Sequence, residues 1–290
     1  MSKEKLSFTK SLDQVAGAAF LGKDTVFRPA EVFQILYETK PECIAKILPP
    51  PLVPYEKPYV ILAHTNFKEV SFDDCLYGPG YLETALYIPC SYNGVKGTFV
   101  VAMILNTDIA TFMGRERGGY PKKMGTVGYY YKGDRYVAFS ARQGIPFVIM
   151  EGDLDGEPND PAFLTELADA VTPDPSQPEL TFNYNFKWAP GLGGKLFSTQ
   201  PMLLQGKKGK FSLGEPKRLG KGKITYIHSD NDPWGDLEVV RVLGCSIDMV
   251  ESRLFAKGGA AYPVDPDAYA PYAFYGWDHM TRDPKWDNKR

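Results

Sequence analysis

Net charge, histidine, cysteine and long apolar runs are all scarce in this chain of 290 residues. Its 33 basic and 35 acidic side chains nearly cancel, so composition gives no reason to expect a nucleic-acid or membrane-surface partner. No stretch approaches the 18 or so apolar residues of a membrane span, and the first residues lack the apolar core of a signal peptide. We therefore expect a cytoplasmic protein that does not associate with membranes.

Cysteine and histidine are also too dispersed for a local metal site. The four cysteines are Cys43, Cys75, Cys90 and Cys245, and the three histidines are His64, His228 and His279. They form no Cys-x-x-Cys pair and no short Cys/His cluster, so we expect free thiols and no bound metal. A Gly-x-Ser-x-Gly motif and a glycine-rich phosphate loop are missing as well, which argues against serine hydrolases and nucleotide-binding enzymes.

What the chain does contain is many short runs of β-branched and aromatic residues. Strands are predicted over residues 32–37, 59–62, 98–105, 126–131, 136–141, 147–151, 222–227 and 238–246. Asn93-Gly94 and residues 132–135 are typical of hairpin turns between such strands. Many short strands at close spacing predict an α+β fold that is mainly antiparallel β, in the form of a barrel with a few flanking helices.

Two helices are predicted by proline at a first helical position and an apolar face behind it. One begins at Pro41 and stops before the prolines at 49–51, and the other begins at Pro161 and ends near Val171. The basic clusters at 207–210 and 217–223 contain glycine and are predicted to be exposed turns.

We interpret residues 1–290 as a single domain, with an N-terminal arm at 1–23 and an aromatic C-terminal tail at 263–290. The aromatic rings of the tail need to be buried on the protein's own barrel or across a subunit interface, because exposed aromatic area is costly. We favour the interface, and therefore expect a homo-oligomer.

The strongest chemical signal is the adjacent pair Lys122-Lys123, which follows Tyr120-Pro121. Two neighbouring ammonium groups repel each other, and each gives up its proton more easily in a site that is short of water. A deprotonated lysine is a nucleophile for carbonyl carbon. The pair therefore predicts a lysine that forms an iminium with a carbonyl compound.

Residues 114–123, Gly-Arg-Glu-Arg-Gly-Gly-Tyr-Pro-Lys-Lys, resemble the active-site segment of the acetoacetate decarboxylase family. The resemblance implies that Lys122 is the Schiff-base lysine and that Lys123 is the neighbour that activates it. Residues 83–97 resemble the strand and turn that carry the family's catalytic glutamate, which falls on Glu83. Weaker resemblance at 31–37 and 183–190 extends the match over about residues 24–255, and it implies the barrel of that family and homo-oligomers.

Two departures from the family pattern affect the substrate end of the site. The early strand has Ala30 where the family places an active-site arginine, and the nearest arginine is Arg28. A second glutamate expected within 58–64 has no counterpart, and Glu69 is the nearest acid. Further candidates for substrate binding are Tyr81, Tyr87, Arg115, Glu116 and Tyr120.

The resemblance implies a lyase that needs no cofactor beyond the covalent iminium on Lys122 and acts on a small oxo acid. The iminium accepts electrons either from a breaking C–C bond, with loss of carbon dioxide, or from a C–H bond, giving an enamine that adds to an aldehyde co-substrate. Because the arginine and the second glutamate are missing, we favour aldol condensation with dehydration. Acetoacetate decarboxylation and a non-catalytic barrel that binds a carbonyl ligand are the alternatives.

Overall fold

The structure is a computed structural model that describes residue 11, residues 22–72 and residues 75–278. Most of the predicted N-terminal arm, the end of the aromatic tail and His279 lie outside the described residues. The strands are β1 (Thr25–Glu38), β2 (Val53–Pro54), β3 (Tyr59–Phe72), β4 (Cys75–Tyr92), β5 (Val95–Leu105), β6 (Lys122–Met124), β7 (Thr126–Lys132), β8 (Arg135–Arg142), β9 (Ile145–Asp153), β10 (Leu180–Lys187), β11 (Met202–Ser212), β12 (Arg218–Tyr226), β13 (Arg241–Leu254) and β14 (Ala260–Pro263). The helices are α2 (Pro41–Ile47), α3 (Asp108–Gly118), α4 (Phe163–Val171) and α5 (Pro266–Tyr269), with short 3-10 turns at Trp234–Asp236 and Ala270–Tyr272.

Seven strands close into a barrel. They are hydrogen-bonded in the order β11, β10, β5, β4, β3, β1 and β13, and β11 also pairs with β13, which completes the ring. All these pairs are antiparallel except β10 with β5, because β10 returns to the barrel by a long connection. Full closure leaves no edge among the seven strands. The predicted mainly antiparallel barrel is thus confirmed, with one parallel pair.

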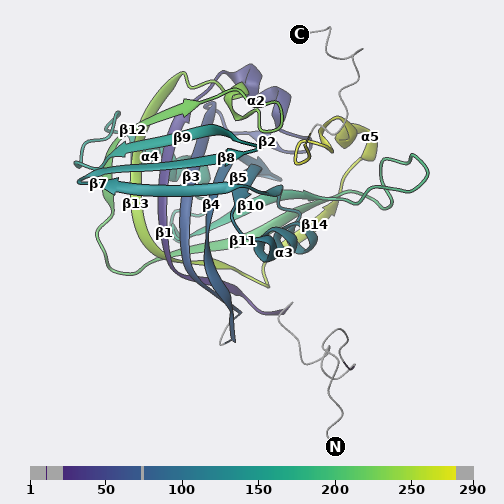
Figure 1. Ribbon diagram of the computed structural model, residues 1–290. Helices are drawn as coiled ribbons and strands as arrows, with labels where there is room; N and C mark the ends of the chain where they lie inside the picture. The colour runs from purple at the N-terminus through teal and green to yellow at the C-terminus, as the bar shows by residue number, and fades with distance from the viewer. Residues whose placement is uncertain (1–10, 12–21, 73–74, 279–290) are drawn as a thin grey trace, which may run out of the picture.

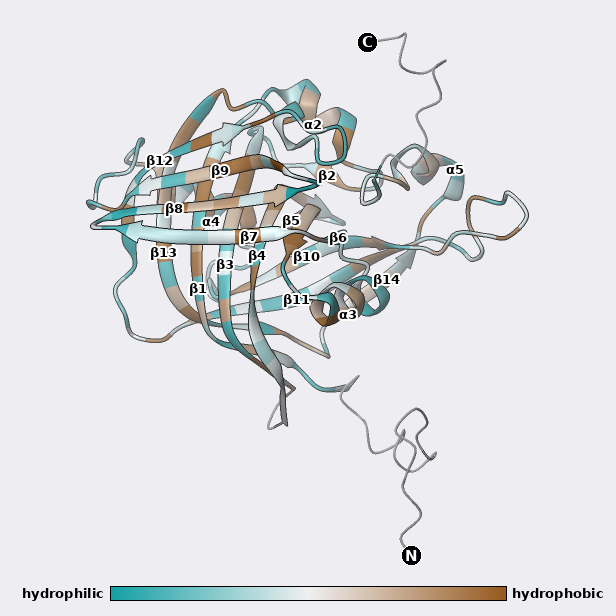
Figure 2. Cartoon of the chain, viewed as in Figure 1, coloured by the Kyte–Doolittle hydropathy of each residue, from teal (hydrophilic) through white to brown (hydrophobic). Residues whose placement is uncertain are grey.

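A second layer covers one side of this barrel. Strands β12, β9, β8 and β7 continue from β13, and Figure 1 shows them crossing in front of β1, β3 and β4. Side chains alternate between the two faces of each strand, so brown apolar and teal polar bands alternate along the ribbons in Figure 2. The outward faces of the barrel strands and the inner face of the second layer bury the largest apolar cluster, which includes Phe33, Phe147 and Met150. The inward faces surround a lumen.

Both predicted helices are present, as α2 and α4. Helix α3 was not expected from the sequence, because it buries only Thr111 and so shows no apolar stripe. It begins after Thr107 and ends at Gly118, and the next residue, Gly119, has a φ of 64°, the left-handed conformation that commonly closes a helix. It packs against β6 and β10, and Figure 1 shows it at the lower right of the barrel.

Strand prediction failed at the two basic clusters. Residues 207–210 lie within β11 and residues 218–223 within β12, so neither cluster is an exposed turn. The glycines between the lysines favoured a turn on composition alone, whereas the barrel needs β11 as the strand that closes it. The hairpins at Asn93-Gly94 and at Gly133 are confirmed, with φ values of 49°, 77° and 62°.

The described part of the aromatic tail packs on its own barrel. Tyr269 stacks on Phe186 with ring centroids 4.6 Å apart, and Trp277 stacks on Trp188 at 5.6 Å. Tyr269 is fully buried by these contacts. The preference for an interface over intramolecular burial is therefore wrong for Tyr269, whereas Trp277 is only partly buried and Phe274 is 52% exposed. The homo-oligomer remains a prediction.

In the described residues, no helix is long and apolar enough to cross a membrane.

A fully buried histidine lies between the barrel and the second layer. His64 has no exposed surface, its Nδ1 lies 3.2 Å from Oγ1 of Thr84, and its Nε2 has no hydrogen-bond partner within the described residues. Burial lowers the pKa of His64 from 6.5 to about 3. Below pH 6.5 the unfolded chain therefore binds a proton that the folded chain excludes, so the free energy of unfolding falls with decreasing pH.

We expect this one group to remove up to about 1.4 kcal/mol of stability per pH unit from about pH 6.5 downward. Urea unfolding at pH 7 and pH 5 of the protein and of a His64→Leu variant measures the effect. Between pH 7 and pH 5 the parent protein should lose about 2 kcal/mol more stability than the His64→Leu variant. A His228→Gln control, at a side chain that is 80% exposed, should follow the parent protein. Parallel pH curves for the parent and His64→Leu would show that His64 does not carry this loss.

Candidate active site

The central feature of the lumen is a buried pair of opposite charges. Nζ of Lys122 lies 2.9 Å from Oε2 of Glu83, and the two side chains are only 9% and 7% exposed. Lys122 begins β6, which pairs in parallel with β5 at Met103, and Glu83 lies on β4, which pairs with the other edge of β5. Two strands from different parts of the sequence thus bring the predicted nucleophile and the predicted glutamate together.

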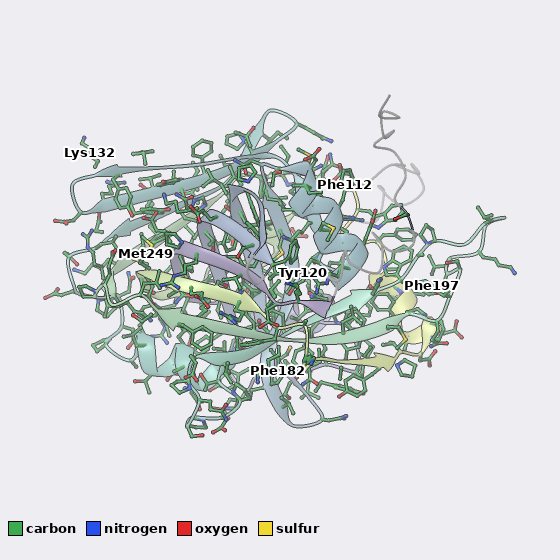
Figure 3. All side chains as sticks on the ribbon, turned by 90° about the horizontal axis from the view of Figure 1, so that it is seen from below. Phe112, Tyr120, Lys132, Phe182, Phe197 and Met249 are labelled. Atoms are coloured by element: carbon green, nitrogen blue, oxygen red, sulfur yellow. The ribbon has the colours of Figure 1, made fainter. Side chains whose placement is uncertain are left out.

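Aromatic rings enclose the lysine. Its Nζ lies 5.4 Å from the ring centroid of Tyr81 and 5.7 Å from that of Tyr120, within range for cation–π attraction. Asn183 donates a hydrogen bond of 3.4 Å to the Tyr120 hydroxyl, and Figure 3 places Tyr120 near the centre of the molecule. Burial raises the pKa of Tyr120, so its hydroxyl stays protonated and is available as a donor. Tyr81 and Tyr120 line the same cavity as Lys122 and Glu83.

Lys123 points away from this site, as expected for the next residue of a strand. Its Nζ lies 2.9 Å from Asp278 and 3.3 Å from Asp232, and Arg142 bridges the same two carboxylates. Hydrogen bonds from Arg142, and then from Lys123, hold the pKa of Asp278 well below its usual range. The positive charge of Lys123 is therefore balanced locally, which weakens the expectation that it activates Lys122 by repulsion.

The other predicted binding residues, Tyr87, Arg115 and Glu116, do not line this cavity. Tyr87 packs beside Tyr120 just outside the cavity, and burial raises its pKa well above the usual value. Arg115 donates a 2.9 Å hydrogen bond to the backbone carbonyl of Lys122, so it holds the lysine strand from behind. Arg115 and Glu116 line a separate pocket, where Glu116 is exposed.

The departures from the family pattern leave an apolar wall. Ala30 is fully buried in a cluster with Phe27 and Phe67, beside the cavity. Arg28 is 64% exposed and pairs with Glu251 outside the cavity, so it does not substitute for the missing arginine. Glu69 is exposed and does not line the cavity, and the residue opposite Glu83 on β3 is Thr65.

The cavity has a volume of about 470 Å³, and its surface is mainly apolar. Such a volume falls within the range of about 300–1,000 Å³ that pockets for drug-sized ligands have. Among the described residues, no group of three or more histidine, cysteine, aspartate or glutamate side chains is placed to hold a metal ion.

Sequence reasoning missed two features of this site. Lys208, predicted to lie in an exposed turn, lines the cavity from β11. The i, i+2 spacing of Gly206, Lys208 and Lys210 is the signal that was available for one inward face of a strand. The second feature is Gly114 on α3, which lies against the Lys122 side chain.

Gly114 allows Lys122 to extend past α3. A Cβ atom added at position 114 would lie 2.6 and 2.7 Å from Cδ and Cε of Lys122. We expect a Gly114→Ala variant to fold with normal stability, because the displaced atoms belong to a flexible side chain and alanine favours helix by about 1 kcal/mol. Displacement of Nζ should nevertheless slow adduct formation at Lys122 about 100-fold. Thermal unfolding and the rate of borohydride trapping measure the two effects, and an unchanged trapping rate would contradict the prediction.

The protein is thus a closed β-barrel with a buried lysine–carboxylate pair in its lumen. The family model described as acetoacetate decarboxylase (ADC) matches residues 16–250. The chain therefore belongs to the acetoacetate decarboxylase family.

Similar proteins come from sequence and from structure. The acetoacetate decarboxylase of Clostridium botulinum (strain Eklund 17B / Type B) is 35% identical over 111 residues, which is 38% of this chain and 43% of that protein. That of Bordetella avium (strain 197N) is 35% identical over 98 residues, which is 34% of this chain and 37% of that protein. The matched stretch thus spans less than half of either relative.

Two solved structures share the fold. One from structural studies of acetoacetate decarboxylase has a TM-score of 0.67 at 20% identity, covering 97% of this chain and all of that one. The enduracididine biosynthesis enzyme MppR, complexed with the condensation product of pyruvate and imidazole 4-carboxaldehyde, has a TM-score of 0.64 at 16% identity, covering 90% of this chain and 97% of that one. At such identities the likeness concerns the fold alone.

Proposed function

We propose that the protein is a carbon–carbon lyase that forms an iminium between Lys122 and a short oxo acid. The observation that carries the proposal is the buried contact of 2.9 Å between Nζ of Lys122 and Oε2 of Glu83. A carboxylate beside a nucleophilic amine takes up protons during addition and returns them during loss of water. The low exposure of the two side chains and the mainly apolar cavity limit contact with bulk water, which slows hydrolysis of an iminium.

The favoured reaction is condensation of a pyruvate-type oxo acid with an aldehyde, followed by dehydration. Lys122 attacks the ketone carbon and water leaves, giving the iminium. Glu83 removes a proton from the methyl carbon, and the C–H electrons form an enamine. The enamine carbon then bonds to the aldehyde carbon, whose oxygen takes a proton, and the iminium forms again. Glu83 removes a second proton from the former methyl carbon as the protonated hydroxyl leaves as water, which forms the C=C bond. Hydrolysis of the iminium then releases an unsaturated oxo acid and free Lys122.

Two observations favour condensation over decarboxylation. The cavity of about 470 Å³ is larger than a four-carbon acid such as acetoacetate requires, and so leaves room for a second reactant. The site also lacks the family arginine at Ala30, which is buried among apolar residues. MppR, whose fold is similar, was solved with the condensation product of pyruvate and imidazole 4-carboxaldehyde, so a fold of this kind can hold such a product.

Acetoacetate decarboxylation is the second candidate, because the curated relatives carry that name. It needs the same iminium but a substrate whose carboxylate leaves as carbon dioxide. The two reactions therefore differ in product while sharing the first covalent step.

Product analysis separates them. The protein is incubated with pyruvate and an aromatic aldehyde, and separately with acetoacetate, while conjugated product and carbon dioxide are measured. We expect a conjugated oxo acid from the first mixture and little carbon dioxide from the second. Rapid decarboxylation without condensation would instead favour the second candidate, and no adduct with either acid after borohydride reduction would refute both.

A further inference from the structure

A second lysine enters the lumen from the strand that closes the barrel. Lys208 lies on β11, opposite Thr181 on β10 and Leu254 on β13. It lines the same cavity as Lys122 and Glu83. The pairing of β11 with both neighbours is regular, so Lys208 shares its inward face with Gly206 and Lys210. Its neighbour Lys207 has its Nζ 5.2 Å from the ring centroid of Phe255.

Lys208 differs from Lys122 and Lys123 in that no carboxylate of the described residues lies within ion-pair distance of it. Lys122 is paired with Glu83 and Lys123 with two aspartates. Within residues 22–72 and 75–278, no ion pair or hydrogen bond reaches Nζ of Lys208. Burial lowers the pKa of Lys208, the Glu83 carboxylate raises it, and the charge of Lys122 lowers it further. Lys208 is partly buried. A cation held in a mainly apolar cavity without a fixed partner is costly, and an incoming anion relieves that cost.

The other basic residues at the cavity have contacts elsewhere, and Lys207, which also lines it, lies over the ring of Phe255. Arg117, at the cavity wall, donates hydrogen bonds to Oγ1 of Thr25 at 3.4 Å and to the carbonyl of Lys23 at 3.3 Å. Arg28 pairs with Glu251 outside the cavity. Because position 30 is alanine, β1 supplies no cation to the lumen there. Lys208 is thus the basic side chain best placed to meet an anion beside Lys122.

We propose that Lys208 binds the carboxylate of the substrate, so that this site selects carbonyl compounds carrying an anionic group. The proposal rests on the proposed iminium chemistry at Lys122. With the carboxylate on Lys208 and the carbonyl carbon at Lys122, the rest of the substrate faces the apolar wall formed by Phe27, Phe67 and Leu254. The predicted substrates are oxo acids with an apolar remainder, as opposed to neutral ketones or aldehydes alone.

Two molecules that differ in one charge test the role of Lys208. Pyruvate and its methyl ester present the same ketone, but only pyruvate carries a carboxylate. Borohydride trapping over a range of concentrations gives a half-saturating concentration and a limiting rate for each. In a Lys208→Met variant, we expect the half-saturating concentration for pyruvate to rise about 10- to 100-fold, as for the loss of a charge-assisted hydrogen bond. The limiting rate, and both values for the ester, should change less than about threefold.

Two further variants make the readout specific. Lys208→Arg keeps the charge and should restore most of the preference for pyruvate. Lys210 points to the same side of β11 but does not line the cavity, and burial, followed by the charge of Lys208, lowers the pKa of Lys210 to about 7. A Lys210→Met variant should therefore retain the parent preference. If Lys210→Met lost the preference for pyruvate as strongly as Lys208→Met, the preference would come from the combined charge of β11 and not from contact with Lys208. That result would overturn the proposal.

Competition in the unmodified protein gives a test that does not depend on how a variant folds. Butyrate has a carboxylate and an apolar chain but no ketone. It should therefore compete with methyl pyruvate and slow the formation of the borohydride-trapped adduct, whereas chloride at equal ionic strength should not. Failure of butyrate to compete, or equal effects of Lys208→Met on pyruvate and its ester, would refute the role of Lys208. Adduct with neither carbonyl compound would instead refute the chemistry at Lys122.

Discussion

A Lys122→Met variant is expected to form no borohydride-trapped adduct and to lose turnover by about 10⁴-fold or more. Methionine fills a similar volume but has no amine, so the covalent step has no nucleophile. Removing one buried charge leaves Glu83 without its partner, and that carboxylate can become neutral by taking up a proton. The variant should thus fold, and mass spectrometry after reduction with an oxo acid should detect only unmodified protein.

Lys123→Met is the matched comparison, since it removes the neighbouring amine on the other side of the strand. Its loss unbalances the cluster with Asp232 and Asp278, so we expect a stability loss of about 1–3 kcal/mol. The folded fraction should still form the adduct with a pH profile close to that of the parent. A clear shift of that profile to higher pH would show that Lys123 activates Lys122 after all, as the sequence alone had predicted.

Replacing Glu83 with glutamine should separate adduct formation from turnover. The amide keeps the shape of the side chain but neither accepts a proton nor balances an ammonium. A buried amine without a counter-charge loses its proton more easily, so trapping at neutral pH should persist or become faster. Proton transfer from the substrate carbon loses its base, and turnover should fall about 10²- to 10⁴-fold.

Single-turnover trapping and steady-state product formation, measured on the same samples, give the two rates. Glu69→Gln is the control, because Glu69 is an exposed acid on the adjacent strand β3 that does not line the cavity. It should leave both rates unchanged. Normal turnover in Glu83→Gln would mean that another group moves the proton, and equal loss of trapping and turnover would assign Glu83 to the first step.

The fold was predictable to the extent that local pattern determined it. Runs of β-branched and aromatic residues predicted the barrel strands β1, β3, β5 and part of β13, and proline at the first helical position predicted α2 and α4. Helix α3 gave no comparable signal, because it rests on the barrel with one buried residue, Thr111. Strand β11 was hidden by its lysines, since a polar inward face is unusual unless the strand encloses a site.

The candidate site was predictable only where chemistry is concentrated in a short stretch. Lys122 and Glu83 were identified from their motifs, and the structure brings them to 2.9 Å. The aspartates that hold Lys123 are more than one hundred residues further along the chain, so the opposite orientation of the two lysines was not visible in the sequence. Arg28 was a candidate by proximity to the expected position, but a bulge after Phe27 and the exposed side of β1 place it outside the cavity.

Locating the reduced adduct within the chain tests most directly whether Lys122 is the nucleophile. The protein is treated with pyruvate and borohydride, digested, and sequenced by mass spectrometry, which distinguishes Lys122, Lys123 and Lys208. We predict modification at Lys122, because it alone of the three combines a carboxylate contact of 2.9 Å with a place in the aromatic cage of Tyr81 and Tyr120. An adduct at Lys123 or Lys208, or none, would contradict that claim.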